Sequence, residues 1–147
     1  MADTNELIHK IGDILLRNAE AEPQPWDYVG WVFALEDGVN YADLRYKFLG
    51  KLQKGFEFAI DKDEAVAAMM ELRDLSKGDD GVPWLEAMIA IRSSDNALRI
   101  LFEFEDPERW SIGPGMLSRR FEILVGEAFP EALDESGAQA ATRTRAK

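Results

Sequence analysis

Three carboxylates at the end of one predicted strand are the residues of this chain best suited to chemistry. Glu103 and Glu105 lie two positions apart, so a strand would place both side chains on one face, and Asp106 follows directly. Paired carboxylates can exchange protons or bind a hard cation such as Mg²⁺. They also suit the solvated outer face of an alternating strand. Solvation, partner contact and catalysis therefore stay open, in that order of preference.

The rest of the sequence offers catalysis little else. His9 is the only histidine and cysteine is absent, which excludes multi-histidine metal sites, cysteine-based zinc sites and nucleophiles paired with histidine. Gly113-Pro114-Gly115 lacks the Lys and Ser/Thr of a phosphate-binding loop, and Asp79-Asp80-Gly81 lacks the alternating ligands of a calcium loop. We therefore expect no enzyme activity, no metal and no cofactor.

Two apolar residues suggest a partner-binding patch instead. Met88 and Leu101 fall on the outward faces of a predicted hairpin, where polar residues are expected. They would either pack beneath a helix or form the apolar centre of a patch with an acidic rim. The candidate partner-binding residues are then Glu57, Glu86, Met88, Leu101, Glu103, Glu105, Asp106 and Trp110.

Composition limits the class of protein and its partners. The chain has 147 residues, enough for one domain but not two, and 46% of them are hydrophobic, as in globular domains. Its 17 basic and 28 acidic residues give a net charge of -11, which disfavours nucleic acid and anionic membranes as partners. The acidic start lacks the basic and apolar regions of a secretory signal, and no apolar run is long enough for a membrane span. We expect a cytoplasmic protein.

Periodicity predicts an α+β fold in the order α-β-β-β-α-β-β-α, with a five-stranded, mainly antiparallel sheet and packed helices. The expected helices cover residues 4–20, 61–75 and 117–128, and the expected strands cover 26–35, 41–49, 55–60, 84–92 and 98–105. Residues 1–130 would form a single domain. Residues 131–147, with little to bury, would form a disordered tail.

Several local features refine this picture. The first strand is apolar on both faces, and Gly30 suggests a bulge in it. In the second strand, Lys47 should lie on a solvated face, and Asp61 with Glu64 resembles a capping box for the middle helix. The hairpin turns at residues 93–96. Its inward face should carry Leu85, Ala87, Ile89, Ile91, Leu98, Ile100, Phe102 and Phe104.

The arrangement of these features resembles the YezG-like immunity protein family. The resemblance covers about residues 5–128 and rests on the opening amphipathic helix, Trp26 with its aromatic strand, Pro83-Trp84 after a long loop, and the segment from Ile100 through Phe102-Glu103-Phe104-Glu105-Asp106 to Trp110. Members are small acidic cytosolic antitoxins that neutralise a cognate nuclease toxin. The resemblance implies toxin binding at the 102–106 strand end, and it implies no catalytic residues. A net charge of -11 fits both that role and simple solubility.

A second resemblance concerns architecture alone. The order of elements, in a small acidic chain without cysteine, is similar to that of type III secretion chaperones. Such a chaperone would be a homodimer that binds an extended segment of a secreted effector, whereas an immunity protein would bind a folded basic toxin. The sequence leaves open which protein partner applies and whether the chain forms a homodimer. An enzyme that uses Glu103, Glu105 and Asp106 is the third and least favoured reading.

Overall fold

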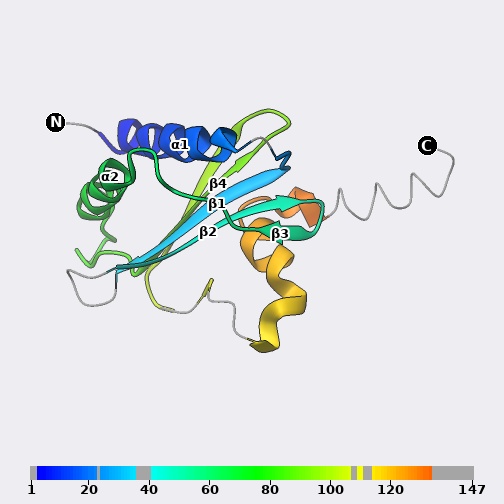
Figure 1. Ribbon diagram of the computed structural model, residues 1–147. Coiled ribbons are helices and arrows are strands. Elements are labelled where there is room, and N and C mark those ends of the chain that lie inside the picture. Colours follow the sequence, from blue (N-terminus) through cyan, green and yellow to red (C-terminus); the bar gives the residue numbers. More distant parts are fainter. Residues whose placement is uncertain (1–2, 23, 36–40, 107–108, 111–113, 134–147) are drawn as a thin grey trace, which may run out of the picture.

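The computed structural model describes residues 3–22, 24–35, 41–106, 109–110 and 114–133, apart from the side chains of residues 114 and 116 (Figure 1). The helices are α1 (Thr4–Ala21) and α2 (Lys62–Leu75), and the strands are β1 (Tyr28–Leu35), β2 (Tyr41–Leu49), β3 (Leu52–Lys54), β4 (Glu86–Arg92) and β5 (Ala97–Glu103). A 3-10 helix η1 (Pro114–Arg119) and a π-helix η2 (Glu122–Gly126) follow. The α+β class and the predicted order of elements are confirmed.

The five strands form one antiparallel sheet in the order β3-β2-β1-β4-β5. β1 lies at its centre, which explains why its sequence is apolar on both faces: six consecutive residues, Tyr28 to Phe33, are buried. The predicted hairpin is β4 and β5, with Arg92 paired to Ala97 across the turn. Asn96 takes the left-handed conformation (φ 56°) that this turn requires.

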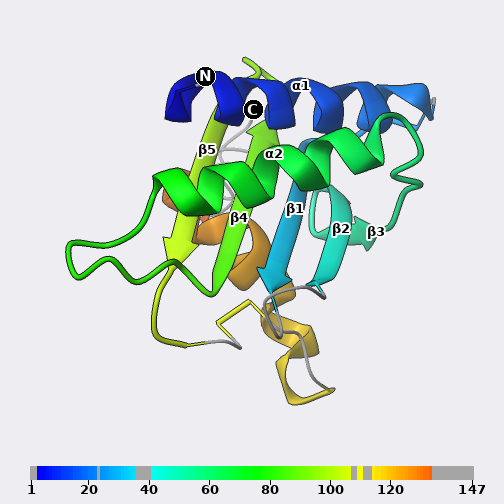
Figure 2. The same ribbon diagram turned by 90° about the vertical axis from the view of Figure 1, so that its left-hand side faces the viewer.

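Helices cover both faces of the sheet. α1 and α2 lie side by side on one face, where Figure 2 shows them in front of the strands, and η1 and η2 lie on the opposite face. The first core, between sheet and α1/α2, includes Trp31, Phe33, Trp84, Ile89 and Leu72, all fully buried. The second core lies beneath the C-terminal helical segments and includes Tyr28, Tyr46, Phe48, Met88, Trp110, Leu124 and Phe129.

Local signals predicted α1 well. Its N-cap is Asp3, whose carboxylate accepts a hydrogen bond from the backbone N–H of Glu6 at 2.8 Å. The stripe of Leu7, Ile11, Ile14 and Leu15 is buried, as its spacing predicts.

The predicted strand over residues 55–60 is wrong. The third strand is β3, three residues long, and the chain then leaves the sheet and runs beneath the helices. Phe56 and Phe58 are buried in the first core, so their alternation reflects packing rather than strand pairing. The backbone of Ile60 binds the side chain of Asn18 instead of a neighbouring strand: its N–H donates to Asn18 Oδ1 at 2.8 Å, and its carbonyl accepts from Asn18 Nδ2 at 2.9 Å.

Two predictions on polar residues fail in the same region. Lys47 is 3% exposed rather than solvated, and its Nζ lies 5.6 Å from the ring centroid of Phe56, because the segment after β3 crosses over that face of β2. Asp61 does not cap α2 with its side chain. It adopts a left-handed backbone (φ 53°), and its carboxylate binds Arg17 of α1 at 3.0 Å.

The C-terminal region also differs from the expectation. In place of one helix over 117–128, η1 and η2 follow each other with the helical residues 120 and 121 between them. Leu117 is 52% exposed, while Leu124, Val125 and Ala128 are buried. The packed body continues to Leu133, with Ala132 buried in the second core. Residues 131–133 therefore belong to the body, and the rest of the predicted tail, 134–147, lies outside the described residues.

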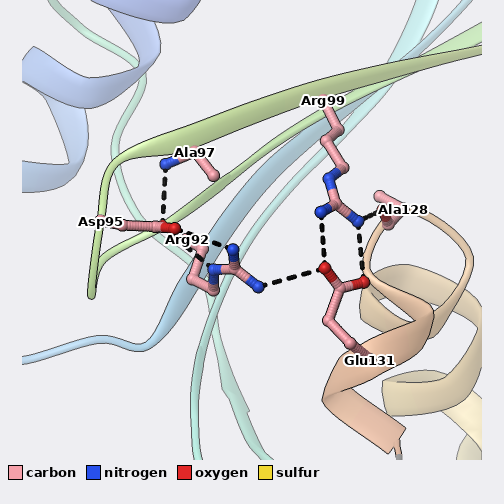
Figure 3. Close-up of polar contacts among 6 residues, drawn as sticks. All are labelled: Arg92, Asp95, Ala97, Arg99, Ala128 and Glu131. Atoms are coloured by element: carbon pink, nitrogen blue, oxygen red, sulfur yellow. Dashed lines mark hydrogen bonds and ion pairs between the residues drawn. The ribbon is translucent and has the colours of Figure 1, made fainter.

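Glu131 fastens this C-terminal end to the hairpin. As Figure 3 shows, its carboxylate bridges Arg92 of β4 and Arg99 of β5, with N–O distances of 3.3 and 2.5 Å. Arg99 also donates to the backbone carbonyl of Ala128 at 3.0 Å. Both guanidinium groups lie over the ring of Phe129, within about 5 Å of its centroid.

Candidate partner-binding site

Two of the predicted site carboxylates face each other across the hairpin. Glu86 of β4 and Glu103 of β5 are paired residues on the face that η2 covers. Like charges directly opposite in a sheet destabilise it, so this pair needs either a counter-charge or a proton. Glu103 has a counter-charge in Arg109, and the burial of Glu86 raises its pKa and so favours its protonated form.

Glu103 is held as an anion. Its Oε2 accepts hydrogen bonds from the backbone N–H groups of Glu105 and Asp106 at 2.9 and 3.0 Å, and its Oε1 binds Arg109 Nη1 at 3.0 Å. These bonds, chiefly that from the Asp106 amide, lower the pKa of Glu103 below its usual range. Glu103 therefore fixes the chain as it turns out of β5.

Glu86 is the opposite case, a buried carboxyl group that can hold a proton near neutral pH. Glu86 is 3% exposed, and burial raises the pKa of its carboxyl group to about 7. The backbone amides of Trp110 and Arg109 oppose that rise, while the negative charges of Asp106 and Glu103 add to it. Oε1 of Glu86 has no hydrogen-bond partner among the described residues. Keeping a buried carboxylate charged costs free energy when one of its oxygens lacks a hydrogen bond.

Trp110 is buried in the second core, so it is not accessible to a partner. It is 1% exposed, and its indole Nε1 donates to Glu127 Oε1 at 3.2 Å. Arg109 binds the same carboxylate, with Nη2 at 2.7 Å, and its guanidinium lies 4.8 Å from the Trp110 ring centroid. Together these contacts attach the segment after β5 to the C-terminal helices.

The apolar pair at the proposed centre of the patch lies under a helix. Met88 is fully buried in the second core, and Leu101, its partner across the hairpin, is partly buried against the same core. Of the two alternatives that the sequence left open, the structure shows packing beneath the C-terminal helical segments.

Glu57 lies apart from the other candidates. It follows β3 at one edge of the sheet, whereas Glu103 lies on β5 at the other. Its backbone N–H donates to a carboxylate oxygen of Glu22 at the end of α1, and its neighbours Phe56 and Phe58 pack on the helix-covered face. Glu57 does not belong to a common surface with Glu86 and Glu103.

The exposed part of the candidate site is the end of β5. Glu105 and Asp106 are exposed, as is Phe104, which was expected on the inward face and is 37% exposed. The loop between α2 and β4 runs beside the end of β5 (Figure 2). A Cβ built on Gly78 of this loop would lie 3.6 Å from the Phe104 ring. That loop brings two more exposed carboxylates, Asp79 and Asp80.

We call Asp79, Asp80, Glu105 and Asp106 the acidic end. The sequence presents the two halves separately, Asp79 and Asp80 in an incomplete calcium-loop pattern and Glu105 and Asp106 in the candidate partner-binding patch. Their 25-residue separation carries no local signal of proximity, so only the packing of the α2–β4 loop against Phe104 joins them.

Neither chemistry nor relatives identify the site further. In the described ranges, no three or more His, Cys, Asp or Glu residues are grouped so that they could hold a metal ion. No helix there has the length and apolar character to cross a bilayer. Comparison with known protein families and with characterised proteins finds no match to this chain.

Proposed function

We propose that this protein is an immunity protein that binds and neutralises a cognate toxin in the cytoplasm. It acts by stoichiometric binding and catalyses no reaction. The toxin class that its charge suits best is a nuclease, because nucleases hold phosphates with clustered Lys and Arg.

The acidic end is the observation that supports this proposal. Four exposed carboxylates from two distant segments gather at one end of the sheet, on a chain of net charge -11. Such a surface attracts a basic protein over long range and raises its association rate, to as much as about 10⁸ to 10⁹ M⁻¹s⁻¹ at low salt. It would compete with the nucleic acid substrate for the same basic groups.

The first experiment is a pull-down of the tagged full-length protein from its own cells, followed by identification of the bound species. The proposal expects a folded basic toxin in a complex of defined stoichiometry. An extended segment of a secreted protein, or an exclusively acidic partner, would contradict it.

A pair of matched variants then locates the surface. The double variant with Asp79→Lys and Glu105→Lys should associate with the captured partner about tenfold or more slowly at low salt. Glu64→Lys with Glu71→Lys makes the same change in net charge on the exposed face of α2 and serves as the control. Equal slowing by both pairs would mean that net charge, and not the acidic end, steers the partner.

Glu103 is deliberately left out of these variants. Its carboxylate binds two backbone amides and Arg109, so its reversal to Lys would disturb the chain that carries Glu105 and Asp106. A loss of binding in such a variant would not distinguish charge from structure.

The secretion-chaperone function is the second candidate, and the observed order of elements favours it. That order, α-β-β-β-α-β-β-α, is the one on which the architectural resemblance rests. A shared fold does not by itself establish a shared function. Capture of an unfolded effector segment in the same pull-down would select this candidate over the immunity protein.

A further inference from the structure

β5 is an edge strand whose outer side pairs with no described residue. It ends the sheet order, and all seven of its residues, Ala97 to Glu103, are half-buried. Five of the seven are apolar. An edge strand of this length and composition is a ready template for a further strand.

We propose that β5 pairs with β5 of a second copy of this chain, antiparallel, with Leu101 of each copy on the two-fold axis. The result would be a continuous ten-stranded sheet. This inference goes beyond toxin or effector binding and does not depend on either.

Charge complementarity within β5 argues for a second copy as the occupant. Edge strands ordinarily carry charges that discourage pairing. Here the two charges of β5 are opposite in sign and four residues apart, at Arg99 and Glu103. With Leu101 on the axis, Arg99 of each copy faces Glu103 of the other, so the strand is complementary to itself.

The rows of side chains across the joined sheet are consistent with this register. Within one copy, Met88 pairs with Leu101 and Glu86 pairs with Glu103. Joining two copies continues the first row as Met88–Leu101–Leu101–Met88, which is apolar throughout. It continues the second row as Glu86–Glu103–Arg99–Ala90, which gives the two facing carboxylates a second cation beyond Arg109.

The side chains on the face that α1 and α2 cover also match in this register. Phe102 of one copy would face Ile100 of the other, and these residues pair with Ala87 and Ile89 within each copy. All side chains in those rows are apolar. The neighbouring symmetric register, with Ile100 on the axis, would instead place Arg99 against Leu101 of the second copy, so the Leu101 register is the better match.

Single cysteines test the register directly, because the native chain contains none. Leu101→Cys should form a disulfide-linked dimer under mild oxidation, since the two residues would be directly opposite. Ala97→Cys is the control on the same strand: its two copies would lie about 27 Å apart, too far to react. Ile100→Cys should cross-link far less than Leu101→Cys, because the two copies would be offset by two residues.

Light scattering of the unmodified full-length protein, at physiological salt to screen repulsion between two chains of charge -11, should show a dimer that dissociates on dilution. Arg99→Glu would place a carboxylate opposite Glu103 at both symmetric positions of the dimer. It should raise the Kd of the dimer at least about tenfold. Glu131→Gln is the control, because it alters the contact of Arg99 within the chain but leaves β5 unchanged.

The proposal is overturned if the protein stays monomeric at about 100 µM, a concentration well above the Kd of a specific dimer. It is also overturned if Leu101→Cys cross-links no faster than Ala97→Cys, or if Ile100→Cys cross-links best. Should Arg99→Glu fail to fold, the cysteine series decides, since it leaves both charges in place.

Discussion

The phenol ring of Tyr46 occupies the space directly above Gly30, its partner across the β1–β2 ladder. A Cβ built on Gly30 would lie 2.2 Å from Tyr46 Oη, closer than any real contact. The hydroxyl continues past the glycine and donates to the carbonyl of Leu124 in η2 at 2.7 Å. Gly30 therefore marks no bulge, since its pairing is unbroken on both sides. It makes room for the side chain that joins the sheet to the C-terminal helices.

Gly30→Ala should lower the free energy of unfolding by about 1 to 3 kcal/mol or more, because the added methyl group forces Tyr46 out of place. Urea denaturation measures this loss. Gly55→Ala is the matched control, since a Cβ there meets nothing within 4 Å, and it should be near neutral. An equal effect of both substitutions would show that the Gly30–Tyr46 contact does not determine the loss.

The free energy of unfolding should fall as pH rises, because Glu86 then loses its proton. Its pKa in the folded protein, about 7, lies above its usual value of 4.5, so the folded state binds the proton more tightly than the unfolded state. The contribution of protonated Glu86 to the free energy of unfolding is complete below about pH 4.5. It is lost as pH rises through 7, which lowers the free energy of unfolding by about 2 to 3 kcal/mol. Glu86→Gln should remove this loss, so its stability relative to the native protein should be higher at pH 8 than at pH 5. The exposed Glu64→Gln is the control.

Glu103 should show the opposite pH dependence. Its folded-state pKa is lowered, so its contribution is present above the usual pKa of a glutamate and is lost as pH falls through the folded value. Glu103→Gln weakens the bond to Arg109 and should cost about 1 to 2 kcal/mol at pH 7. Urea titrations at pH 7 and pH 4 should show the difference between variant and native protein shrinking in acid. A difference that grows in acid would contradict the assignment of Glu103 as the anion of the pair.

Truncation should locate the end of the packed body. Removing residues 134–147 is expected to leave the Tm nearly unchanged, because their composition offers little to bury. Removing residues 131–147 also deletes the Glu131 bridge and the buried Ala132, and should lower the Tm by roughly 3 °C or more. Thermal unfolding of the two shortened chains, compared with the full chain, measures both effects. A large drop from the shorter deletion alone would show that residues after Leu133 contribute to stability.

Local pattern was sufficient for most of the fold. The spacing of Leu7, Ile11 and Ile14 predicted α1, the apolar run of β1 predicted a strand covered on both faces, and the turn at 93–96 predicted the β4–β5 hairpin. These features depend on neighbours in sequence, and helix and strand periods are properties of the backbone itself. The strand at 55–60 failed because Phe56 and Phe58 alternate to fill a core, which looks the same in sequence as strand pairing.

The candidate site depended on contacts that a linear pattern cannot express. The sequence by itself determined the net charge of -11, the absence of cysteine, the α+β order and the carboxylates at the end of β5. Only the tertiary structure decided that Met88, Trp110 and Glu86 are buried, and that the α2–β4 loop with Asp79 and Asp80 packs at Phe104, beside the exposed Glu105 and Asp106. The reason is physical: whether a polar or apolar side chain is exposed depends on which distant segment covers it, and η2 and the α2–β4 loop are distant in sequence from the strands they cover.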